Sequence, residues 1–131
     1  MNNYITFSVL VICQYIMDRF TSTCNTTLGE FLLFFHHIFA VYLYFGGLFF
    51  NPLYHLIVVV CTLFHWYTYK KCILTEITNT YCGVDINRPF HDYVRMLKIY
   101  KLNTKIHWII LFCLIFYDVC LIMNVSSSNF N

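Results

Sequence analysis

The histidines inside the apolar stretches are the residues of this sequence whose side chains are best suited to bind a cofactor. Five of the six histidines lie in or beside long apolar runs. Neutral imidazoles ligate haem iron and metal ions, and an ionisable group in hydrocarbon is by default a sign of function. A helical projection at about 1.5 Å per residue brings four of them toward one end of the expected helices. These candidate cofactor ligands are His36, His37, His65 and His107.

Other polar residues on the same runs predict a second, non-catalytic arrangement. Asp118 is the single acid in the last apolar run. Buried polar groups pair with one another, so we expect a polar network that fixes the helices together. Its predicted members are His55, Asp118, Tyr44 and Thr62.

Two other uses of the histidines stay open. The neighbours His36 and His37 point about 100° apart on a helix, so they do not easily ligate one ion, and no zinc-type spacing is present. We therefore predict no cofactor and no metal, with haem as the alternative. A proton or ion path along His65, His107 and Asp118 is the other alternative.

Nucleophilic catalysis has little support in the sequence. There is no G-x-S-x-G motif, and no serine lies near a His-Asp pair. Cys72 has basic neighbours that favour a thiolate, but the sequence identifies no base for it. We predict no catalytic residue and expect a protein that is not an enzyme.

The composition indicates which elements must position these side chains. Hydrophobic residues make up 60% of the 131 residues and charged residues 11%, against roughly 25% charged in soluble domains. Aromatic residues reach 21%, which suits lipid-facing surfaces and interfacial belts. The net charge of +2 is too small to indicate a nucleic-acid partner. The sequence therefore predicts an integral membrane protein.

Four apolar runs predict an all-α, four-helix membrane bundle in a single domain, residues 1–131. Pro52 opens the third run, where its missing N–H costs nothing, so the second and third runs form a tight antiparallel hairpin. The first run is either a crossing or a signal segment. The predicted helices span about 4–20, 31–50, 52–69 and 106–125, and Thr27 or Asn25 is expected to cap the second.

The basic residues predict the orientation of the bundle. Seven of the eight Lys and Arg residues fall between positions 70 and 105, and the eighth, Arg19, follows the first run. Because basic connections stay in the cytoplasm, we expect the 70–105 loop to be cytoplasmic and both termini to lie outside.

Part of that loop has the pattern of an amphipathic helix in the membrane interface. From Pro89 onward, apolar residues recur at helical spacing with cations on the other face. A solvated helix packed on its own bundle is the alternative. The residues expected to bind anionic lipid headgroups are Arg95, Lys98, Lys101 and Lys105.

The seven cysteines do not predict a disulfide framework. Four lie in apolar runs, where cysteine is usually a small core residue. The other three, Cys24, Cys72 and Cys82, lie in connections, and an odd trio is poor evidence for oxidation.

A short motif follows the third apolar run: Cys72, Ile73, Leu74, Thr75 and Glu76. Together with His36 or His37, Gly46-Gly47 and His55, it resembles a family of small four-helix bacterial membrane proteins of unknown function. That family has a Cys-x-Leu-Thr-x-x-Glu stretch, whereas Glu76 directly follows Thr75 here; it also usually has proline where Ile73 stands and a less basic loop. The resemblance covers about residues 31–125 and implies a fold but no activity.

These patterns predict a small multi-pass membrane protein that acts as a structural or interaction module. Expected partners are the lipid bilayer, anionic headgroups, and a second copy or another membrane protein. The richness in Phe, Tyr, Ile and Asn also resembles proteins of AT-rich genomes, such as those of protists and large DNA viruses. A viral membrane is therefore a candidate location.

Overall fold

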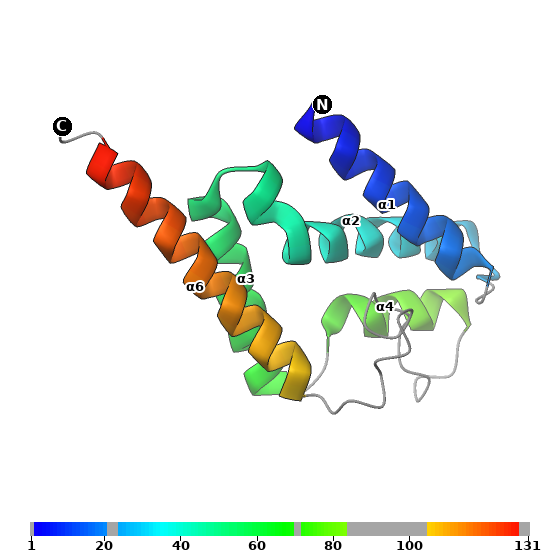
Figure 1. The fold of residues 1–131 in the computed structure, drawn as a ribbon. Coiled ribbons are helices and arrows are strands. Elements are labelled where there is room, and N and C mark those ends of the chain that lie inside the picture. Colours follow the sequence, from blue (N-terminus) through cyan, green and yellow to red (C-terminus); the bar gives the residue numbers. More distant parts are fainter. Residues whose placement is uncertain (1, 21–23, 70–71, 84–104, 129–131) are drawn as a thin grey trace.

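The computed structural model describes residues 2–20, 24–69, 72–83 and 105–128, without the side chains of 105–107 and 125–128. These residues form helices and, within the described ranges, no strand, which confirms the predicted all-α class. The helices are α1 (Asn3–Arg19), α2 (Thr27–Phe49), α3 (Pro52–Tyr69), α4 (Ile73–Cys82) and α6 (Lys105–Ser128) (Figure 1).

Three of the predicted runs agree closely with α1, α3 and α6, whereas α2 starts earlier than expected. The helix begins at Thr27 because Thr26, and not Thr27 or Asn25, is its N-cap. The Thr26 hydroxyl accepts a hydrogen bond from the Gly29 N–H at 3.0 Å. Glu30 adds a negative charge in the first turn, where the helix dipole favours it.

The helix α4 lies inside the segment predicted as a loop. It ends at Gly83, whose φ of 70° closes the helix in the left-handed region that glycine tolerates. Thr78, Asn79 and Cys82 are its buried residues. The interfacial helix predicted to follow Pro89 lies outside the described residues.

The central element is α2, which contacts each of the other four helices. In Figure 1, α4 runs along α2, and α3 lies side by side with α6. The contact between α3 and α6 is the most extensive between any two described helices. A small apolar cluster of Leu43, Val59, Leu63 and Leu111 joins α2, α3 and α6. The molecule is therefore built around one long apolar helix.

By length and composition, α2 is the one described helix apolar enough to cross a membrane. A shorter apolar segment, Trp108–Asn124, forms most of α6. The four long helices thus lie close to where the sequence predicts them, while a bundle of four crossings stays a prediction.

Candidate functional site

A fully buried histidine–aspartate pair joins α3 to α6. Nδ1 of His55 lies 2.6 Å from Oδ2 of Asp118, and neither side chain is exposed. The other ring nitrogen of His55, Nε2, lies 3.1 Å from the backbone oxygen of Leu43 on α2. One imidazole therefore connects three helices.

The geometry fixes how many protons this pair holds. A carbonyl oxygen only accepts hydrogen bonds, so Nε2 of His55 carries a hydrogen and donates it to Leu43. The short contact between Nδ1 and Asp118 needs one more proton, held by the ring or by the carboxyl group. In either case the pair has no net charge, which lowers the cost of burying it.

The Gly46-Gly47 pair on α2 makes room for these two side chains. A Cβ atom on Gly46 would lie 2.6 Å from Cδ2 of His55. One on Gly47 would lie 2.9 Å from Nδ1 of His55 and would collide with Oδ1 of Asp118. These glycines are therefore required by the polar pair, as well as by close helix packing.

A second buried pair joins α1 to α2. Nε2 of His37 lies 3.1 Å from Oδ2 of Asp18, and both side chains are almost completely buried. Val11 and Gln14 precede Asp18 on the buried face of α1. This face brings two polar residues against α2 at one-turn spacing.

Next to this pair, a small surface network closes the end of α1. Arg19 forms an ion pair with Glu30 at 2.9 Å, and the Tyr15 hydroxyl donates to the same carboxylate at 2.8 Å. Thus the Arg19–Glu30 ion pair holds α1 to the first turn of α2, and the buried His37–Asp18 pair holds α1 further along the same helix.

Their positions decide what the histidines can bind. Both ring nitrogens of His55 are engaged, and Nε2 of His37 faces a carboxylate. The rings of His36 and His37 are 6.2 Å apart, centroid to centroid. Within the described part of the chain, no group of three or more His, Cys, Asp or Glu side chains converges as metal ligands. The two histidine–aspartate pairs each link two helices.

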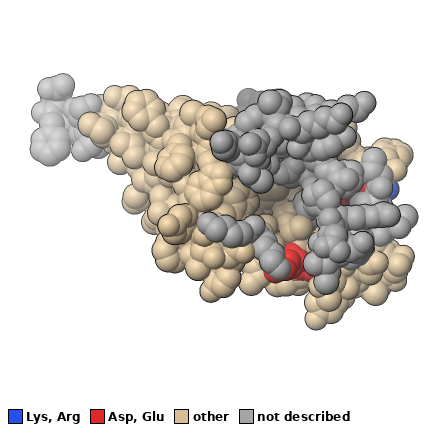
Figure 2. Space-filling model, turned by 90° about the horizontal axis from the view of Figure 1, so that it is seen from below, with Lys and Arg blue, Asp and Glu red and all other residues tan. Residues whose placement is uncertain are grey.

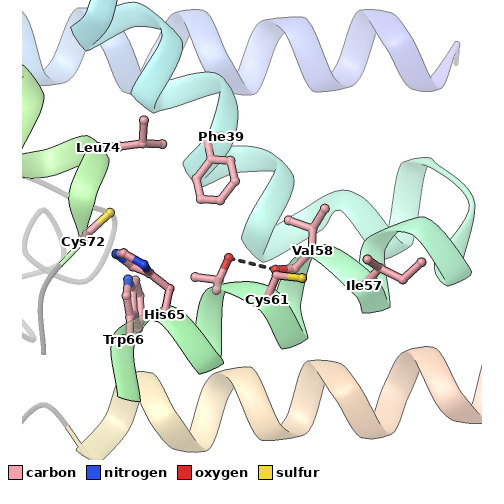
Figure 3. A pocket seen from close by; sticks show the side chains of 9 residues that line it. Phe39, Ile57, Val58, Cys61, His65, Trp66, Cys72 and Leu74 are labelled. Atoms are coloured by element: carbon pink, nitrogen blue, oxygen red, sulfur yellow. Dashed lines mark hydrogen bonds between the residues drawn. The ribbon is translucent and has the colours of Figure 1, made fainter. Parts of the chain in front are cut away.

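His65 lies apart from both pairs, in an apolar cavity of about 310 Å³ between α2, α3 and the start of α4 (Figure 3). Phe39, Trp66 and Cys72 also line it. Nε2 of His65 is buried and has no hydrogen-bond partner among the residues described. The thiol and the imidazole thus line one pocket, whereas Glu76 of the same motif lines a separate pocket formed by α4 alone.

The remaining predicted residues fall into two groups. Thr62 donates to the Val58 backbone oxygen of its own helix at 2.8 Å, and Tyr44 and Thr75 are half-buried. The structure thus brings His55 and Asp118 together but gives Thr62 only a local partner. The side chains outside the described parts are those of Arg95, Lys98, Lys101, Lys105 and His107.

Two features of the site are absent from the sequence-based prediction. Asp18 was expected only to close the first run, although Val11, Gln14 and Asp18 recur at helical spacing and mark one face. The other is a disulfide between Cys24 and Cys82, which are 58 residues apart. It corrects the expectation that the connecting cysteines form no oxidised pair.

Comparisons of the chain with protein-family models, with curated protein sequences and with solved structures find no match.

Proposed function

We propose that the chain is a multi-pass membrane protein that serves as a structural or interaction module. The observation that carries the proposal is the distribution of side chains between interior and surface. Nine of the buried residues are polar or charged and nine are hydrophobic, among those that the structure describes. A soluble protein of this size buries mainly apolar side chains.

The outer surface has the opposite character. Large apolar side chains are exposed on all four long helices: Ile12 is 48% exposed, Phe35 48%, Phe64 72% and Phe116 72%. Water would penalise this much exposed apolar area, whereas lipid does not. Among the described residues visible in Figure 2, uncharged residues cover most of the face and charged residues form only small patches.

Contacts between the α1–α2 connection and the end of α4 support an even number of membrane crossings between these two points of the chain. The Cys24–Cys82 disulfide and a 2.6 Å hydrogen bond from Thr26 to the Tyr81 backbone oxygen bring the α1–α2 connection against α4. Cys24 and Cys82 thus lie at the same end of α2, and on one side of the membrane if α2 and α3 each cross it. This is the relation that the four-helix proposal requires.

A structural role follows from how the polar groups are used. Both buried pairs link helices, and the engaged ring nitrogens of His55 leave it no site for a ligand. The segment 84–104 carries four of the eight basic residues, and Lys105 follows it directly. We propose that this segment binds an acidic surface, with anionic headgroups as the first candidate, while the helices anchor it. The bacterial four-helix family and a viral membrane stay part of this proposal.

Two measurements on the full chain test the proposal. Alkaline carbonate washing should leave the protein in the membrane pellet, and release into the supernatant would contradict membrane integration. In nanodiscs, the protein should capture vesicles containing anionic lipid but not zwitterionic vesicles. The substitutions Arg95→Gln, Lys98→Gln and Lys101→Gln together should remove that capture, whereas Asn103→Gln should preserve it. Equal capture by the triple variant would exclude the basic segment as the binding surface.

A further inference from the structure

The Cys24–Cys82 disulfide bears on which compartment its side of the membrane faces. Cys82 is buried at the end of α4, and its partner lies just before α2. A Cβ on Gly29 would lie 2.8 Å from the Tyr81 backbone oxygen and would collide with Sγ of Cys24. The bond is therefore part of the contact between α4 and α2, and not an accidental pairing of exposed thiols.

The thiols that remain are distributed differently. Cys13, Cys61 and Cys113 are exposed on the apolar surfaces of α1, α3 and α6. Cys72 and Cys120 are half-buried. Of Cys24, Cys72 and Cys82, the three cysteines outside the long helices, only Cys72, the N-cap residue of α4, is free. Oxidation is thus confined to the pair that the fold brings together.

We infer that the side of the membrane carrying the disulfide and α4 is the non-cytoplasmic side. Disulfides persist in oxidising compartments and are rare in the cytosol, where thiols are kept reduced. This inference rests on the proposed membrane location. It places the termini in the cytoplasm and the 70–105 segment outside it, the reverse of the orientation that the basic residues predict.

The distribution of basic residues and the disulfide are different kinds of evidence for the orientation. The excess of Lys and Arg in cytoplasmic loops is a bias acting when helices insert, and added charges elsewhere can reverse it. A disulfide requires that two electrons and two protons leave the Cys24 and Cys82 thiols, passed to an oxidant such as a disulfide oxidoreductase. Only a compartment that supplies such an oxidant and lacks a strong reductant keeps the bond, so we give the disulfide more weight.

The first arm of the test asks whether the bond exists in the membrane. The full chain, taken directly from cells and denatured without reductant, should accept five maleimide adducts, one for each free cysteine. After reduction it should accept seven, the total number of cysteines. Seven adducts without reductant would overturn the inference.

The second arm asks on which side the bond lies. Because α6 separates α4 from the C-terminus, an epitope tag after Asn131 should be reached by antibody once digitonin opens the plasma membrane. Binding to intact cells, or only after full solubilisation, would overturn the inference. The Cys61→Ser variant is the control for thiol substitution and should keep the result, with one adduct fewer. Release of the protein by alkaline carbonate would instead show that the membrane proposal itself fails.

Discussion

At the scale of single residues, His55 is a fully buried side chain with a partner on each of two other helices. It contacts Asp118 on α6 and the Leu43 backbone on α2, and Gly47 has no side chain because the pair occupies that space. Oδ1 of Asp118 is buried without a hydrogen-bond partner in the described part of the chain. The carboxyl group therefore depends on His55 for compensation of its burial.

Removing one member of this pair should destabilise the fold strongly. His55→Ala leaves Asp118 buried and unpaired, so we expect a loss of about 3–5 kcal/mol in the free energy of unfolding. Titration with SDS in mixed micelles measures this loss. Phe64→Ala on the outer surface of α3 serves as the control and should change stability much less, because Phe64 is already exposed. A His55→Ala protein as stable as the control would contradict the role given to the pair.

At the scale of helices, the sequence predicts the long elements well and the short one poorly. Pro52 marks the start of α3, and the apolar run after it is long enough to define a helix by itself. By contrast, α4 has ten residues, too few to be stable alone, and depends on its contact with α2 and on the disulfide. Such tertiary stabilisation leaves little signal in the local sequence.

The same reasoning explains which site residues were predictable. Asp118 stood out as the one acid in an apolar run, so a pair with a histidine was a natural expectation. Asp18 lies beside Arg19 at a helix end, where a charged residue usually faces water. Only the position of α2 makes it a partner of His37. Spacing indicated the right face of α1, but not the helix against which it packs.

Removing the disulfide should loosen α4 more than the rest of the fold. A crosslink between residues 58 apart stabilises a chain by about 4 kcal/mol in the chain-entropy estimate. We expect the Cys24→Ser, Cys82→Ser double variant to lose stability of that order and to expose α4 amides to faster hydrogen exchange. The Cys13→Ser variant, which removes an unpaired thiol, should behave like the unchanged protein. Unchanged exchange in α4 of the double variant would show that the bond does not hold this helix.

At the scale of the whole molecule, buried polar links lie beside a small apolar core, and many large apolar side chains lie on the outer surface. His37, His55 and Asp118 are among the largest fully buried side chains, while Phe64 and Phe116 are largely exposed. Composition predicts a membrane protein, but only the structure shows which face of each helix is polar. Among the described helices, α2 alone is long and apolar enough to cross a membrane. The proposal that α1, α3 and α6 also cross it therefore depends on their exposed apolar faces.

Three native thiols provide the most direct test of that proposal. Cys13, Cys61 and Cys113 are exposed near the middle of α1, α3 and α6. In variants that keep the disulfide and one of these thiols, a nitroxide label can be attached at each position in turn. Its collision rates with oxygen, which partitions into lipid, and with a water-soluble nickel chelate are then compared in liposomes. We predict that oxygen dominates at all three positions; domination by the nickel chelate at any of them would show that the helix concerned lies in water and would contradict the multi-pass account.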